Sequence, residues 1–231
     1  NYFTFLPLLP ELVSGALTFE DVAFPLRAHA RHLGFRFVRA RVERVLCERR
    51  QVVTTVATLP YDYLVVALGA TPHYYGNTDI ERNALPLTSV EDALKIRHHV
   101  LQTIEAAALE KDEEQRARQL SFAVVGGGPS GVEVASEIQG LVRRVLARDY
   151  GIEVDCPVAL IHGGSRILNG WDESLAAEGL KILRQRGVDV RLRTRVEGFS
   201  SGEVHIRPKG RDADVLAAES LIWTAGMRPA S

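Results

Sequence analysis

The residues best suited to chemistry in this chain form a glycine-rich segment, Gly126 to Glu133, directly after four apolar residues, Phe122 to Val125. Gly126 allows a tight turn, Gly128 leaves space for phosphate oxygens, and Gly131 lets a helix pack closely on the preceding strand. The segment therefore predicts a strand, a turn and the start of a helix, where backbone N–H groups meet the pyrophosphate of a dinucleotide.

Composition narrows the class of protein. The chain has 231 residues, of which 46% are hydrophobic, so it can form one large or two modest soluble domains. A formal net charge of -1 gives no electrostatic reason to expect nucleic acid or an anionic membrane as partner. Cys47 and Cys156 form no C-x-x-C redox pair, and the seven histidines show no metal-ligand spacing, so no metal site is expected.

The residue pattern in the first half of the sequence predicts a mixture of short helices and strands. A short helix is expected to end near Gly34, followed by β-like runs at 36–39, 41–47 and 51–59. The run 64–68 is apolar throughout, which predicts a strand covered on both faces.

A long helix is expected to begin after Ser89, with Ser89 and Asp92 forming a capping box. Helical spacing predicts that one face of this helix carries Val90, Leu94, Arg97, Leu101, Ile104 and Ala108.

The second half alternates strands and helices beyond the glycine-rich segment. A strand is predicted at 158–161, a helix at 173–186 closed by Gly187, and a strand at 188–192. Short β runs are expected around Val196, 204–206 and Val215, before a last strand within 219–226. The pattern of a strand, small residues and a proline occurs twice, at 65–72 and at 222–229.

Four segments together resemble one protein family: 5–9, 61–71, 126–133 and 222–229. In order and spacing they are similar to the two-dinucleotide-binding flavoproteins of the pyridine nucleotide-disulfide oxidoreductase superfamily, and most of all to the type II NADH dehydrogenases, which are NADH:quinone oxidoreductases. The resemblance implies an α/β fold with a Rossmann-like, doubly wound NAD(P)-binding domain at 119–231. It also implies an incomplete FAD-binding α/β domain at 1–118 with a small antiparallel β insertion.

The activity implied by the resemblance is hydride transfer from NADH or NADPH to FAD, and then electron transfer to a quinone. Because the flavin carries the redox chemistry, no catalytic side chain is expected. The NAD(P)H-binding residues implied are Gly126, Gly127, Gly128, Pro129, Ser130, Gly131, Glu133, His162, Arg166, Ala225 and Gly226. The FAD-binding residues implied are Pro7, Leu8, Val42, Ala67, Gly69, Ala70 and Thr71, although Leu8 and Val42 can equally be ordinary core residues.

Two features depart from the family pattern. The FAD fingerprint expected before residue 1 and the Gly-Asp motif expected after residue 231 are not in this sequence, so we expect a piece of a longer chain that binds FAD poorly and is inactive alone. At the end of the strand 158–161 the family usually has an acid that binds the adenosine ribose, and this chain has His162. His162, Ser165 and Arg166 could accept a 2′-phosphate, so NADPH and NADH both stay open.

Two other functions stay open at this point. One is a flavoprotein that reduces a ferredoxin or rubredoxin-like protein, and the other is an NAD(P)H-responsive binding module. Cys47 and Cys156 do not lie where sulfide oxidation would need them. The expected partner is a small-molecule acceptor such as a quinone, without nucleic acid, and a homodimer is compatible with the resemblance. The expected location is the cytoplasm or the inner face of the cytoplasmic membrane, with membrane contact only through segments outside this sequence.

Overall fold

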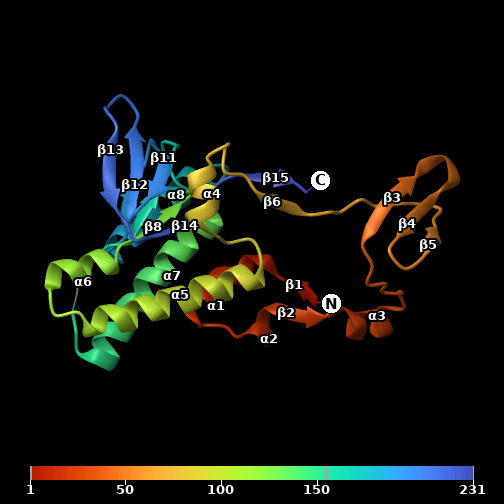
Figure 1. Ribbon diagram of the computed structural model, residues 1–231, viewed down its shortest axis with the longest axis horizontal. Helices are drawn as coiled ribbons and strands as arrows, with labels where there is room; N and C mark the ends of the chain where they lie inside the picture. The colour runs from red at the N-terminus through yellow and green to blue at the C-terminus, as the bar shows by residue number, and fades with distance from the viewer. Residues whose placement is uncertain (1, 154–155, 231) are drawn as a thin grey trace.

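Five parallel strands form the central sheet of the protein, which we describe from a computed structural model (Figure 1). The structure describes residues 2–153 and 156–230, so the outermost residues of the two expected domains, 1 and 231, lie outside it. The strand order is β10 (Asp189–Arg191), β9 (Ala159–Ile161), β8 (Phe122–Val125), β14 (Ser220–Trp223) and β7 (Leu85–Pro86). The predicted α/β class is confirmed, with the glycine-rich segment following the middle strand.

Helices cover one face of this sheet, and a second sheet covers the other. The helical layer comprises α1 (Leu9–Ser14), α5 (Val90–Leu109), α7 (Pro129–Val145) and α8 (Glu173–Gln185). The other layer is an antiparallel sheet of β11 (Thr194–Ser200), β12 (Glu203–Pro208) and β13 (Asp214–Ala217), joined by α4 (Thr78–Asn83). Because successive strand residues point to opposite faces, Phe122 and Val124 enter the helical core while Ala123 and Val125 face the antiparallel sheet.

Helix α5 confirms the predicted start but corrects the predicted face. The Ser89 hydroxyl accepts the Asp92 N–H at 3.1 Å, whereas the Asp92 carboxylate accepts the N–H of Thr88 rather than that of Ser89. Leu94 is 42% exposed. The buried residues are Val90, Ala93, Ile96, Val100, Ile104 and Ala107. The prediction followed the large side chains Leu94 and Leu101, whereas the buried face includes the small residues Ala93 and Ala107.

An arm extends from this body (Figure 1). Three of the expected strands, at 36–39, 51–59 and 64–68, differ from the structure there. It carries α3 (Leu26–Leu33) and a sheet of β3 (Val42–Leu46), β4 (Gln51–Thr54) and β5 (Thr58–Pro60). The expected helix end at Gly34 is confirmed, with φ of +73°. The run 36–39 is not a strand, and the run 51–59 is two strands separated by a turn.

The run 64–68, predicted as a buried strand, has no regular structure, and Val65 is 88% exposed. A buried parallel strand needs partners on both sides, and no strand in the described part of the chain pairs with this run.

The two similar segments at 65–72 and 222–229 meet in space. Strand β6 (Ala70–Pro72) pairs in antiparallel register with β15 (Met227–Pro229), so that Pro72 lies opposite Met227. Strand β7 and helix α5, which precede residue 119, belong to the sheet and the core of the second half. The division at 118/119 therefore crosses a shared core and stays a prediction.

The remaining elements are short. They are β1 (Tyr2–Thr4), η1 (Leu6–Leu8), α2 (Phe19–Val22), β2 (Ala23–Pro25), η2 (Cys47–Arg49), α6 (Glu113–Gln119) and η3 (Leu146–Tyr150). Among the residues that the structure describes, no helix combines the length and apolarity needed to cross a bilayer. The same residues include no group of three or more His, Cys, Asp or Glu side chains placed to hold a metal ion.

Candidate nucleotide-binding site

The glycine turn joins the carboxyl end of β8 to the first turn of α7. Gly126 has a φ of +126°, and its N–H donates to the Ile161 carbonyl at 3.0 Å. A Cβ on Gly131 would overlap the Gly126 carbonyl oxygen and lie 2.6 Å from Thr224 Oγ1. Gly126 therefore supplies the reversed backbone of the turn, and Gly131 allows α7 to lie against it.

Gly128 differs from these two glycines because its side faces open space. Its φ of -79° and ψ of 178° suit any residue, and no atom lies within 4 Å of the position that a Cβ would take. The first N–H groups of α7 follow it, and such groups have no acceptor inside their own helix. Open space beside free N–H donors is the geometry that a pyrophosphate needs.

His162 lies directly against this turn. Its Nδ1 accepts the Gly127 N–H at 3.1 Å, and a Cβ on Gly127 would lie 2.5 Å from the His162 ring. Burial lowers the pKa of His162, and a hydrogen bond with the Arg166 backbone offsets this only in part. Because Nδ1 accepts the hydrogen bond from Gly127, the neutral form of the ring carries its proton on Nε2, and the lowered pKa favours that form. No sequence motif connects residues 127 and 162, so this contact was not predicted.

An apolar cavity of about 190 Å³ adjoins the start of α7. The residues around it come from η1, α1, β6, α7, β15, the end of β14 and the two positions after β7. They are Leu6, Leu9, Pro72, Leu87, Thr88, Ser130, Trp223, Thr224, Gly226 and Met227. The cavity thus brings together the expected phosphate turn, the segment at 225–226 and residues flanking Pro7 and Leu8.

The end of β14 is held by two side-chain hydrogen bonds that the sequence did not reveal. Thr224 Oγ1 donates to the Val125 carbonyl at 2.8 Å, and Trp223 Nε1 donates to the His73 carbonyl at 3.3 Å. Gly226 has a φ of +74°, and a Cβ there would lie 2.6 Å from the Tyr75 hydroxyl. These contacts fix one wall of the cavity.

Glu133 lies on α7 but not among the residues that line this cavity. Desolvation raises its pKa, and the nearby carboxylates of Glu11 and Glu137 raise it further. Glu11 Oε2 is itself buried without a hydrogen-bond partner. This acidic group lies between α1 and α7, and the predicted role of Glu133 near the nicotinamide stays a prediction.

The residues expected to bind FAD fall into two places. Pro7 and Leu8 lie in η1 beside the cavity, and Ala70 and Thr71 lie in β6, preceded by Gly69 with a φ of +77°. Leu8 also packs partly on the helical core, as its alternative interpretation allows.

Two others lie apart from these. Ala67 is exposed in the irregular segment, and Val42 is 49% exposed in the arm, so Val42 is not a core residue of the described chain.

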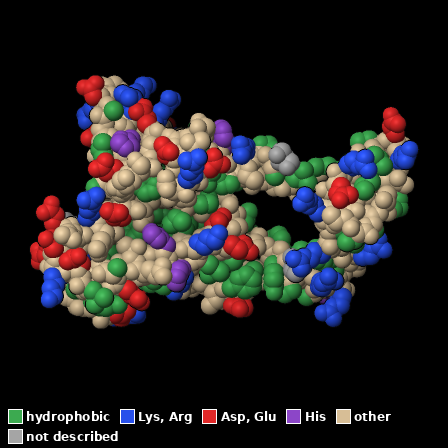
Figure 2. Space-filling model, in the orientation of Figure 1, with side chains coloured by type: hydrophobic (Ala, Val, Ile, Leu, Met, Phe, Trp, Pro, Cys, Tyr) green, Lys and Arg blue, Asp and Glu red, His purple; other side chains and the backbone are tan. Residues whose placement is uncertain are grey.

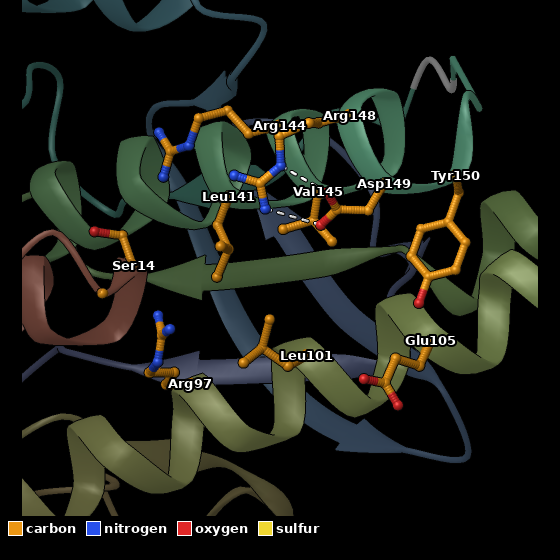
Figure 3. A pocket seen from close by; sticks show the side chains of 11 residues that line it. Ser14, Arg97, Leu101, Glu105, Leu141, Arg144, Val145, Arg148, Asp149 and Tyr150 are labelled. Carbon is orange, nitrogen blue, oxygen red and sulfur yellow. Dashed lines mark hydrogen bonds and ion pairs between the residues drawn. The ribbon is translucent and has the colours of Figure 1, made fainter.

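A second cavity, of about 420 Å³, lies between α1, α5 and the end of α7 (Figure 3). Two of its arginines already have partners: Arg97 donates to the Val13 carbonyl at 3.3 Å, and Arg148 pairs with Asp149 at 2.6 Å. Glu105 adds a negative charge at the end where Tyr150 lies (Figure 3). Mixed charge and distance from the glycine turn make this cavity unsuited to a dinucleotide.

The family of the chain follows from a comparison with known families. The profile of the pyridine nucleotide-disulphide oxidoreductase family matches residues 5–231. The chain therefore belongs to this family, of which the glycine turn and the parallel sheet are the expected framework.

Particular relatives within the family are also similar over almost all of this chain. The external alternative NAD(P)H-ubiquinone oxidoreductase B4, mitochondrial, of Arabidopsis thaliana is 30% identical, over 98% of this chain and 41% of that protein. The type II NADH:quinone oxidoreductase NdhA of Mycobacterium tuberculosis is 30% identical, over 96% of this chain and 49% of that protein. The structure of NDH2 from Plasmodium falciparum in complex with NADH has a TM-score of 0.89 at 26% identity, over 98% of this chain and 49% of that one. The chain spans less than half of each.

Proposed function

We propose that this chain forms the NAD(P)H-binding part, and a portion of the FAD-binding part, of an oxidoreductase that passes a hydride from NAD(P)H to FAD and electrons to a quinone. The observation that carries the proposal is the open face of Gly128 above the first turn of α7. The relatives named as NAD(P)H-ubiquinone and NADH:quinone oxidoreductases support the choice of donor and acceptor.

The residues present fit a dinucleotide at the turn. The N–H groups of Ser130 and Gly131, in the first turn of α7, would hold the pyrophosphate. Ala225 and Gly226 would border the nicotinamide, because they follow β14 at the same edge of the sheet. FAD, when bound, supplies the redox chemistry of the reaction.

The chain's own contribution on the FAD side is placement and exclusion of water. Leu6, Pro72 and Met227 give the cavity an apolar wall that suits the flat face of a ring system. No acid or base of this chain is assigned a proton-transfer role.

Exposed apolar side chains near the arm support a larger FAD domain in the intact protein. Tyr2, Phe3 and Phe5 are each about half exposed, at 50%, 51% and 47%, and Val65 is more so. Figure 2 shows hydrophobic side chains along the rim of the opening between the body and the arm. We propose that the rest of the FAD domain covers these side chains, and that any peripheral contact with the cytoplasmic membrane, or any homodimer, is made in that larger protein.

The proposal is tested in two stages. Titration of this chain with NADH and NADPH, followed by tryptophan fluorescence, should show saturable binding that Gly128→Val abolishes. Absence of binding, or binding unaffected by Gly128→Val, would refute the site.

In the second stage, the full-length protein should oxidise NAD(P)H rapidly with a soluble quinone. Turnover only with a small iron–sulfur protein would instead support the ferredoxin-type reductase, and tight binding with negligible turnover would support the nucleotide-responsive module.

A further inference from the structure

The loop at the carboxyl end of β9 lacks the negative charge that is typical of an NADH site. In dinucleotide-binding folds an acidic residue at this position hydrogen-bonds the ribose hydroxyls, and arginine near it accommodates a 2′-phosphate. Here the strand ends at His162, followed by Gly163, Gly164, Ser165 and Arg166. No carboxylate occupies the loop itself.

Strand β11 brings a second arginine to this loop. The Thr194 N–H donates to the His162 carbonyl at 2.9 Å, and the Arg193 N–H donates to the Gly164 carbonyl at 2.8 Å. These bonds place Arg195 over Gly163, with Arg195 Cγ 3.8 Å from the position of a Cβ on Gly163. Arg195 is exposed and forms no ion pair within the described part of the chain.

Arg166 is the arginine of the loop itself, and its ion pair with Glu173 is weak. Its Nη1 lies 3.3 Å from Glu173 Oε1, but the Glu173 side chain is 91% exposed, and the buried Nη1 makes no hydrogen bond. Because the carboxylate of this pair is almost fully exposed, the pair contributes little, so a phosphate can take the place of Glu173. The other nearby acid, Asp172, is engaged at the start of α8, where it accepts the Ser174 N–H at 2.8 Å.

We propose that Arg166 and Arg195, at the loop 162–166, form a subsite for a 2′-phosphate, so that this site takes NADPH in preference to NADH. The inference rests on the proposed function, because it assumes that a dinucleotide lies on the glycine turn. His162 contributes by position rather than by charge: its neutral ring is bonded to Gly127 and leaves the loop without the negative charge that would repel the phosphate. Guanidinium groups are well suited to this task because they bind phosphate oxygens in pairs.

The experiment compares NADPH with NADH, and 2′-AMP with 5′-AMP, by isothermal titration of the chain. We expect NADPH to bind at least about tenfold more tightly than NADH, since one charge-assisted hydrogen bond is worth that factor. Arg195→Gln should remove about tenfold of the NADPH affinity and leave NADH within about twofold, with Arg195→Lys between the two. His162→Glu should reverse the preference.

The matched control is Arg118→Gln, because Arg118 pairs with Glu219 before the amino end of β8, away from the loop. It should change neither affinity. Equal or tighter binding of NADH by the unchanged chain, or equal effects of Arg195→Gln and Arg118→Gln, would overturn the 2′-phosphate subsite alone. Failure of both dinucleotides to bind would overturn the proposed function as well.

Discussion

Two glycines of the turn, three residues apart, should respond in opposite ways to the same added methyl group. A Cβ on Gly131 would lie 2.6 Å from Thr224 Oγ1 and 2.9 Å from the Gly126 carbonyl carbon, both below the 3.0 Å that real Cβ atoms keep. Helix α7 must therefore shift away from the turn. Overpacking of this kind costs about 1–3 kcal/mol. Gly131→Ala should lower the free energy of unfolding by that amount.

Gly128→Ala is the matched control for folding, because nothing lies within 4 Å of its Cβ and its backbone suits any residue. Its free energy of unfolding should fall by less than about 1 kcal/mol, which is the scale of a changed helix cap. The methyl group instead occupies the space proposed for phosphate oxygens, so the affinity for NADPH or NADH should fall by about tenfold or more.

Urea unfolding measures the first quantity and nucleotide titration the second. The reasoning fails if Gly131→Ala unfolds at the same urea concentration as the unchanged chain. It fails equally if Gly128→Ala binds nucleotide with unchanged affinity.

Two further predictions concern the helical layer. The half-buried His99 lies 2.7 Å from Ser220 Oγ, and its pKa is lowered from 6.5 by burial and by the charge of His98, so the native state favours the neutral ring. The neutral ring therefore contributes to the free energy of unfolding above pH 6.5, and this contribution is lost as the pH falls through the lower native pKa. In His99→Gln the melting temperature should fall less steeply as the pH drops below 6.5. Arg97→Met removes the bond to the Val13 carbonyl and should cost about 1 kcal/mol in urea unfolding. Lys95→Met, on the exposed side of the same helix, is its control, and an equal effect of both would contradict the role of Arg97.

Local patterns predicted the part of the site that is local in the chain. The strand, turn and helix at 122–145 follow from apolar residues, three glycines and a proline within a short segment, and the structure has these elements there. The roles of these residues in binding stay predictions. By contrast, the bond from Gly127 to His162 and the approach of Arg195 to Gly163 join residues more than thirty positions apart, and no spacing rule encodes them.

The errors in the fold have a similar origin. The run 64–68 has the composition of a buried strand, but a strand forms only where a partner offers its backbone, and the described chain offers none there. In α5 the helical periodicity was correct, but the buried face is shifted by one residue at several positions, because Ala93 is buried where the large side chain of Leu94 was expected. The recurrence at 65–72 and 222–229 was visible in the sequence, but the pairing of β6 with β15 was not inferred from it.

The pairing of β6 with β15 also bears on how the polypeptide could be rearranged. Pro72 and Met227 lie opposite each other, so the chain leaves and re-enters this ribbon at one point. Residues facing each other across two antiparallel strands are about 5 Å apart, a gap that a hairpin loop of two to five residues closes. Excision of 73–226 with such a loop in its place would thus leave the flanking ribbon continuous, whereas α1, which packs on α5 and α7, would lose the helices that cover it.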